Sequence, residues 1–143
     1  MPNAANDGFE PPLCGRVLYI EDAEVNFDVV KAMLSRHPGV SLQHAPNGLS
    51  GVQMARETEP DFVLLDMHLP DISGVEVVRR LSQEIAARRF RVTLLTGDKF
   101  TIDVIKAMSL GAFEYLLKPV DVDRLDGALR RGLTAPRTER ERT

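Results

Sequence analysis

The sequence predicts an α/β fold in which a five-stranded parallel sheet is covered by helices on both faces. Five short apolar runs alternate with five helical patterns along the 143 residues, and this alternation is typical of parallel strands joined by helices. Three of the runs, VLYI (17–20), FVLL (62–65) and VTLL (92–95), are almost continuously apolar. Because strands buried on both faces have this composition, these runs predict the interior of the sheet.

The elements follow one another in strict alternation. We predict strands at 16–20, 40–45, 61–65, 91–95 and 112–117, and helices at 24–36, 47–58, 74–88, 99–109 and 121–133. The second strand, VSLQHA, alternates apolar and polar residues, which suits the edge of a sheet. Since right-handed crossovers leave few other arrangements, an edge position for this strand predicts a flavodoxin-like, doubly wound fold with strand order 2-1-3-4-5.

The two ends of the chain are predicted to be flexible. Residues 1–14 are rich in Pro, Asn and Gly, and residues 134–143 alternate basic and acidic side chains without an apolar anchor. We therefore expect the folded domain to span 15–133. The single cysteine, Cys14, falls in the lead-in, where we expect a reduced thiol.

The composition argues against several classes of protein. The formal net charge is −3, so no overall basic field indicates direct nucleic-acid binding. No apolar run reaches the roughly 18 residues that span a bilayer, and the first residues lack the pattern of a secretory signal. We expect a cytoplasmic protein that does not bind membranes.

Chemically active side chains gather where the predicted strands end. Five of them directly follow four different strands: Glu21, Asp22, Asp66, Thr96 and Lys118. Each has an ordinary explanation when taken alone: helix capping or a turn for the acids, a local backbone bond for the hydroxyl, a surface position for the lysine. Independent caps need not cluster, however, and open α/β sheets bind ligands at the carboxyl ends of their strands.

This combination of groups predicts metal-assisted phosphoryl chemistry. Carboxylates brought close together repel one another, and a hard divalent cation, Mg²⁺ or Mn²⁺, relieves that repulsion. Asp66, at the tip of a buried strand, is then placed to act as a nucleophile that accepts a phosphoryl group. The Lys118 ammonium and the Thr96 hydroxyl can neutralise the phosphoryl oxygens, while Gly97 leaves room beside them.

Four motifs resemble the receiver domain of bacterial two-component response regulators, the CheY-like receivers. They are VLYIEDAEVN (17–26), PDFVLLDMHLPDISGVEVVRRL (60–81), VTLLTGD (92–98) and GAFEYLLKPVD (111–121), and the resemblance covers about 16–133. It implies that Asp66 accepts a phosphoryl group from a sensor histidine kinase or a histidine phosphotransfer protein in a Mg²⁺-dependent reaction. It also implies a phosphorylation switch rather than an enzyme, one that catalyses only its own phosphorylation and slow dephosphorylation.

The resemblance further implies roles for individual residues. The implied metal ligands are Glu21, Asp22, Asp66 and the backbone carbonyl of His68. Lys118 is the implied ammonium partner of the phosphoryl group, and Pro119 is implied to follow a cis peptide bond.

Other positions match the family's switching and tuning residues. Thr96 and Tyr115 are the implied switch pair, although an aromatic on a strand is also a plain core residue. The residues expected to line the phosphoryl group are Met67 and Gly97, and those expected to tune its lifetime are His68 and Asp98. For His68, the alternative is a solvent-exposed loop histidine.

The fourth predicted helix suggests an output surface. Its segment carries more apolar residues than one stripe can hold: Phe100, Ile102, Val104, Ile105, Met108 and Leu110. Unless the helix is broadly buried, some of them face solvent. We expect this helix, the strand at 112–117 and the helix at 121–133 to form a partner or homodimer surface that changes on phosphorylation.

Three other functions compete with this interpretation. An aspartyl-nucleophile phosphohydrolase commonly has a second Asp two residues after the nucleophile, where this chain has His68. A flavin carrier needs hydroxyl and N–H groups in its first loop, where this chain has the anionic EDAEVN. A degenerate receiver that acts as a phosphorylation-independent docking module is disfavoured because all five key side chains are present.

Overall fold

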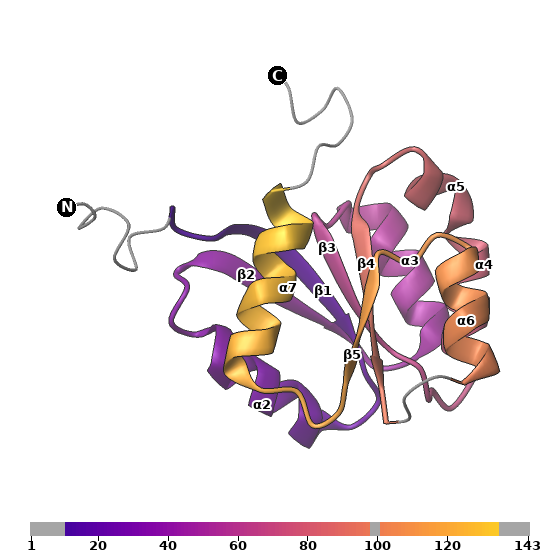
Figure 1. The fold of residues 1–143 in the computed structure, drawn as a ribbon, viewed down its shortest axis with the longest axis horizontal. Coiled ribbons are helices and arrows are strands. Elements are labelled where there is room, and N and C mark those ends of the chain that lie inside the picture. The colour runs from indigo at the N-terminus through magenta and orange to yellow at the C-terminus, as the bar shows by residue number, and fades with distance from the viewer. Residues whose placement is uncertain (1–10, 98–100, 135–143) are drawn as a thin grey trace.

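The computed structural model describes residues 11–97 and 101–134. Its five strands form one parallel sheet in the order β2-β1-β3-β4-β5, which confirms the predicted fold class and strand order (Figure 1). The elements are β1 (Cys14–Ile20), α2 (Glu24–Leu34), β2 (Gly39–Ala45), α3 (Gly48–Thr58), β3 (Phe62–Asp66), α4 (Gly74–Arg80), α5 (Ser82–Ala86), β4 (Arg91–Thr96), α6 (Ile102–Ser109), β5 (Glu114–Leu117) and α7 (Val122–Thr134).

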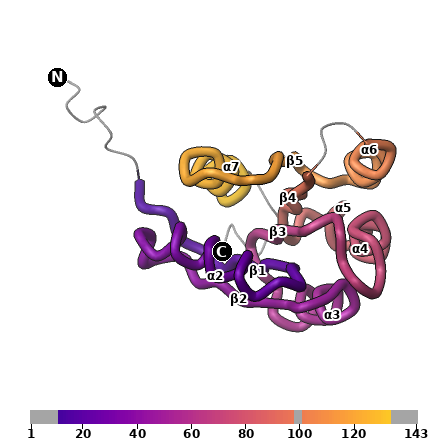
Figure 2. Tube along the Cα trace, turned by 90° about the horizontal axis from the view of Figure 1, so that it is seen from below, coloured from indigo at the N-terminus to yellow at the C-terminus, as the bar shows by residue number. Residues whose placement is uncertain are grey.

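Helices lie on both faces of the sheet (Figure 2). Two separate hydrophobic clusters fill the space between the helices and the sheet. Successive side chains of a strand point to opposite faces, so β1 sends Ile20 into one cluster and Tyr19 into the other. The Ile20 cluster lies under α3, α4 and α6, and the Tyr19 cluster lies under α2 and α7. All five residues of β3 are buried, as expected for a central strand.

The prediction of one continuous helix at 74–88 is wrong, because the structure divides this segment into α4 and α5. The division falls at Leu81, whose φ of −95° and ψ of 10° leave helical geometry. Leu81 is fully buried, and its apolar side chain gives no sequence signal for a break. The second piece ends before Arg88, which adopts a positive φ of 60°.

The structure also corrects the expectation for Cys14. This residue does not lie in a flexible lead-in but begins β1, where it pairs with Gly39 of β2. The preceding Leu13 is only 4% exposed and belongs to the core on the α2 and α7 face. An apolar residue shortly before a strand therefore anchors the start of the folded unit.

Side-chain caps fix the loops at the carboxyl ends of the strands. Asn47 caps α3 by accepting a hydrogen bond from the Ser50 amide, and the Ser50 hydroxyl accepts one from the Asn47 amide. Asp71, from the loop after β3, accepts hydrogen bonds of 2.8 Å from the amides of Gly48 and Leu49. The loop that follows Asp66 is thereby tied to the start of α3.

Within residues 11–97 and 101–134, no helix combines the length and the apolar composition needed to cross a bilayer.

Candidate functional site

Three carboxylates meet at the carboxyl ends of two neighbouring strands. Glu21 and Asp22 directly follow β1, and Asp66 is the last residue of β3. One ligand oxygen from each lies within 4.8 Å of the others. Glu21 and Asp66 are 1% and 2% exposed, whereas Asp22 is open to solvent. The strand order thus brings together residues that are 45 positions apart, as the sequence predicts.

Asp66 has two donors that offset the cost of its burial. Lys118 Nζ lies 3.1 Å from Asp66 Oδ1, and the backbone amide of His68 donates to the same oxygen at 3.0 Å. The Lys118 side chain is 32% exposed and that of Asp66 only 3%. Because an unpaired buried carboxylate is costly, this ion pair explains how a charged residue ends a fully buried strand.

Backbone hydrogen bonds hold the ends of β3, β4 and β5 in register around Asp66. The amide of Met67 donates to the Leu95 carbonyl at 3.1 Å, and the amide of Lys118 donates to the Thr96 carbonyl at 2.8 Å. Thr96 is 2% exposed and closes β4 opposite Leu117. The backbones of Thr96 and Lys118 are therefore fixed relative to the end of β3, and the Lys118 ammonium contacts Asp66 from there.

The surroundings of Glu21 contain residues that sequence reasoning missed. Glu21 Oε1 accepts a hydrogen bond from the Tyr19 hydroxyl at 3.0 Å, and Oε2 accepts from the Ala23 amide at 3.0 Å and from Asn26 Nδ2 at 3.3 Å. Burial, together with the Glu21 carboxylate, raises the pKa of Tyr19 well above its usual value. The hydroxyl is therefore a neutral donor. A buried tyrosine needs a hydrogen-bond partner for its hydroxyl. A tyrosine within an otherwise apolar strand was therefore the sequence signal that could have indicated this contact.

A fourth contact reaches the Glu21 backbone. His44 Nε2 lies 2.7 Å from the Glu21 carbonyl oxygen, and in this contact the ring nitrogen donates. The His44 ring also stacks on Phe27, with ring centroids 4.2 Å apart. Side chains from β1, α2 and β2 thus surround Glu21.

The remaining predicted site residues occupy different environments. The Met67 side chain is buried in the core beneath the site, whereas His68 and Gly97 are exposed at its rim. Tyr115 is partly buried against the core on the α6 side. The roles predicted for Met67, Gly97 and Tyr115 remain predictions.

Two further predictions have different outcomes. The peptide bond between Lys118 and Pro119 is cis, as the resemblance implies. Asp98, the second expected tuning residue, lies outside the residues that the structure describes.

Gly74 also shapes the site, although the sequence indicated it only as the start of a predicted helix. A Cβ at this position would lie 2.7 Å from Met67 Sδ and 2.9 Å from Met67 Cα. The Gly74 amide donates to the Met67 carbonyl at 3.3 Å. Only a residue without a side chain lets α4 begin this close to the backbone that follows Asp66.

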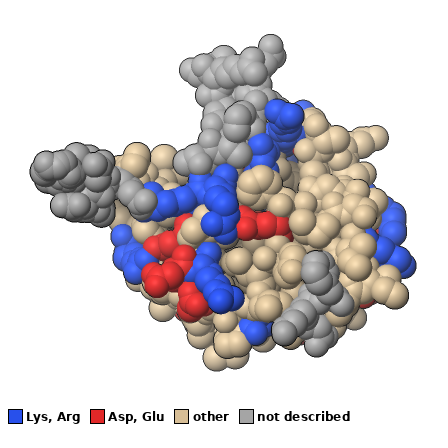
Figure 3. Space-filling view, viewed as in Figure 1, with Lys and Arg blue, Asp and Glu red and all other residues tan. Residues whose placement is uncertain are grey.

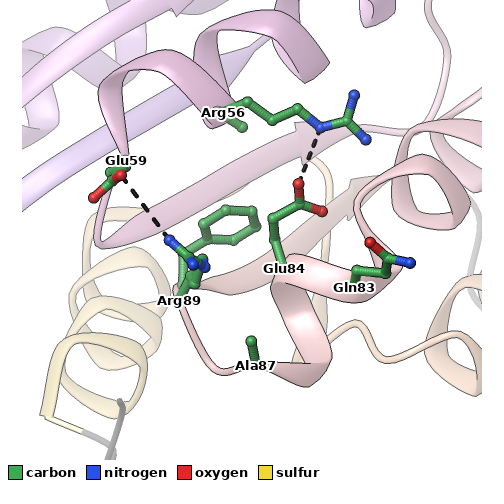
Figure 4. Close-up of a pocket in the computed structure, with 8 residues that line it drawn as sticks. Arg56, Glu59, Gln83, Glu84, Ala87 and Arg89 are labelled. Carbon is green, nitrogen blue, oxygen red and sulfur yellow. Dashed lines mark hydrogen bonds and ion pairs between the residues drawn. The ribbon is translucent and has the colours of Figure 1, made fainter. Parts of the chain in front are cut away.

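A surface depression lies away from the carboxylates, next to the amino-terminal ends of β3 and β4 (Figure 4). Its charged residues pair with each other: Arg56 with Glu84 at 3.0 Å, and Arg89 with Glu59 at 4.0 Å. It contains none of the residues at the carboxyl ends of β1, β3, β4 and β5. The candidate site is therefore the carboxylate cluster.

The donor set of this cluster fits a hard divalent cation. Its three carboxylate oxygens are the ligand type that Mg²⁺ prefers, and Mg²⁺ usually keeps waters and takes few protein ligands. One exposed member, Asp22, leaves the cluster accessible from solvent. A phosphoryl oxygen could complete such a site next to Asp66 and Lys118.

Comparisons with known proteins agree with this geometry. The family model described as "Response regulator receiver domain" matches residues 17–130. Protein PilH of Pseudomonas aeruginosa is 33% identical over 110 residues, which make up 77% of this chain and 90% of PilH. The transcriptional regulatory protein CseB of Streptomyces coelicolor is 35% identical over 119 residues, 80% of this chain and 49% of CseB. The chain spans about half the length of CseB and of other transcriptional regulators that it matches.

One solved structure has a fold similar to that of this chain and contains a bound metal ion. The receiver domain of sensor histidine kinase PA1611 from Pseudomonas aeruginosa PAO1 is 28% identical, with a TM-score of 0.75. The match covers 85% of this chain and 99% of that domain, which holds a magnesium ion coordinated in its active-site cleft.

Proposed function

Because this chain belongs to the family of response regulator receiver domains, we propose that it accepts a phosphoryl group on Asp66 from a histidine phosphodonor in a Mg²⁺-dependent reaction. The observation that carries the proposal is the position of Asp66. It ends a buried strand, lies 3.1 Å from the Lys118 ammonium, and shares a cluster with Glu21 and Asp22.

In the proposed step, an Asp66 carboxylate oxygen bonds to phosphorus while the bond from phosphorus to the donor's imidazole nitrogen breaks. The imidazole leaves with the electron pair of that bond, and the product is an aspartyl phosphate. The buried strand β3 positions the Asp66 carboxylate. Lys118 supplies positive charge next to it, where the phosphoryl oxygens would bind. Positioning and charge neutralisation are the main requirements of phosphoryl transfer.

Glu21, Asp22, Asp66 and the His68 carbonyl would hold the metal. When bound, Mg²⁺ supplies charge that screens the carboxylate and phosphoryl oxygens from each other. The similar receiver domain with magnesium in its cleft supports this assignment. His68 is exposed beside Asp66, and we propose that it affects the lifetime of the phosphoryl group.

We propose that phosphorylation changes the conformation of a surface formed by α6, β5 and α7. Lys118 links Asp66 to this surface, since its ammonium contacts Asp66 and its backbone amide, just after β5, donates to the Thr96 carbonyl. On α6, Val104 and Ala107 are buried, whereas Ile102 and Ile105 are 69% and 51% exposed. As the sequence predicts, some apolar residues of this helix thus face solvent, where a partner or a second copy would cover them.

The phosphodonor must reach Asp66 from the exposed side of the cluster. On α2, Val25 and Val29 are 67% and 48% exposed. Val29 also lines a depression that includes Lys118 and Pro119. We propose that a sensor histidine kinase or a histidine phosphotransfer protein contacts this apolar surface.

The test is incubation with acetyl phosphate and Mg²⁺, followed by intact mass and amide-exchange measurements on the same samples. We expect the wild type to gain the mass of one phosphoryl group and to change its exchange at residues 101–118. Asp66→Asn should show neither effect, whereas Asp123→Asn, an equivalent change on the exposed start of α7, should behave like the wild type. A folded wild type that gains no mass would instead indicate the degenerate docking module.

A further inference from the structure

The Glu21 carboxylate has little freedom in this structure. A carboxylate has about four acceptor sites on its two oxygens. Two donors, the Ala23 amide and Asn26 Nδ2, occupy Oε2, and the Tyr19 hydroxyl occupies one site of Oε1. Glu21 therefore has one acceptor site left for a ligand, and that site is on the oxygen that Tyr19 holds.

The Tyr19 hydroxyl is itself held in place. Tyr19 is 2% exposed and packs in the core on the α2 and α7 face. Its ring stacks on Phe27 with centroids 6.1 Å apart, and Phe27 stacks in turn on His44. Since His44 also contacts the Glu21 carbonyl at 2.7 Å, one group of packed rings fixes both ends of Glu21.

We propose that Tyr19 is a positioning residue that makes the carboxylate cluster selective for Mg²⁺ over larger divalent cations. The inference rests on the proposed function, because it assumes that Glu21, Asp22 and Asp66 hold the metal. With Oε1 fixed by Tyr19, Glu21 presents a single oxygen site in one direction. Mg²⁺ requires near-ideal octahedral geometry, whereas Ca²⁺ accepts six to eight oxygens in flexible arrangements.

Loss of the Tyr19 hydroxyl should therefore affect the two ions differently. In Tyr19→Phe the ring and its packing stay, but Glu21 Oε1 loses its donor, so the carboxylate is held only through Oε2 and Oε1 offers two acceptor sites instead of one. The direction of the Glu21 ligand is then less fixed. This weakens the binding of Mg²⁺, which requires the stricter geometry, more than the binding of Ca²⁺. Removal of groups that orient metal ligands typically costs about 10- to 100-fold in affinity.

The experiment measures the Kd of Mg²⁺ and of Ca²⁺ by isothermal titration calorimetry on the wild type, Tyr19→Phe and Thr93→Val. Thr93→Val is a matched control, since Thr93 is another fully buried hydroxyl residue of the sheet and its Oγ1 has no hydrogen-bond partner. We expect Tyr19→Phe to weaken Mg²⁺ binding by about tenfold and Ca²⁺ binding by a smaller factor. Thr93→Val should leave both constants unchanged.

Several results would overturn the inference. An unchanged Mg²⁺ constant in Tyr19→Phe, or an equal loss for both ions, would contradict it while leaving the proposed function intact. The same holds if Thr93→Val produces the same losses. A wild type that binds no Mg²⁺ would overturn the proposed function as well. Circular dichroism of each variant is the control that tests whether the fold is retained.

Discussion

At the scale of single residues, the site is a balance of charges. Three carboxylates lie within 4.8 Å of one another, and one ammonium, that of Lys118, contacts Asp66 at 3.1 Å. Asp66 is compensated by Lys118 and by the His68 amide, and Glu21 by three hydrogen-bond donors. Asp22 is the exposed member of the cluster, so its charge adds repulsion that a bound cation would relieve.

We predict that Asp22→Asn stabilises the metal-free protein and weakens the response to Mg²⁺. The substitution removes one of three clustered negative charges, and like charges at this distance oppose folding. A ligand that binds only the folded state at a hundred times its Kd adds about 2.7 kcal/mol, and Asp22→Asn should lose most of that gain. Denaturant unfolding with EDTA and with Mg²⁺ measures both effects. Equal Mg²⁺ responses in the two proteins would show that Asp22 is not a ligand.

At the scale of elements, the loop after β3 matters as much as the strand itself. Gly74 lets α4 begin against the backbone of Met67, and Asp71 ties the same loop to the start of α3 through the amides of Gly48 and Leu49. The loop that carries His68 is therefore fixed at several points. A turn-forming aspartate in the sequence gives no indication that its partner is a helix 22 residues away.

We predict that Asp71 contributes to acid destabilisation. Burial raises the pKa of Asp71, but hydrogen bonds from the Leu49 and Gly48 amides outweigh it and lower the pKa below its usual value. A carboxyl group with a lowered folded-state pKa contributes stability above its unfolded pKa of about 4, and that contribution is lost as the pH falls through the folded value. Urea unfolding between neutral and acidic pH should therefore show a shallower decline for Asp71→Asn than for the wild type. Asp123→Asn, at an exposed position on α7, serves as the control, and equal declines in all three proteins would refute the role of Asp71.

At the scale of the whole molecule, the two faces of the sheet present different surfaces. Around α7, acidic and basic side chains intermingle (Figure 3), and Arg131 pairs with Glu114 of β5 at 2.8 Å. Arg36, after α2, pairs with Asp126 of α7. On α6, Ile102 and Ile105 are instead exposed and apolar. The output surface proposed above thus combines a charged helix, α7, with a helix that exposes two isoleucines, α6.

The sequence was sufficient to predict the sheet and the cluster, because both depend on patterns along single strands. Continuous apolar runs identified the interior strands, and the residue after each run, such as Asp66, falls at the shared edge. The break at Leu81 was missed because a buried leucine fits a continuous helix equally well. The contact between Tyr19 and Glu21 was missed because strand periodicity predicts that Tyr19 is buried but does not identify its hydroxyl's partner.

A crystal structure with Mg²⁺ and beryllofluoride, which mimics a phosphoryl group, tests the central claim most directly. We predict beryllofluoride on Asp66 with Lys118 and Thr96 in contact with it. We also predict Mg²⁺ bound by Asp22, Asp66, the His68 carbonyl and the single free site of Glu21. Beryllofluoride absent from Asp66, or a metal bound away from these carboxylates, would contradict the account.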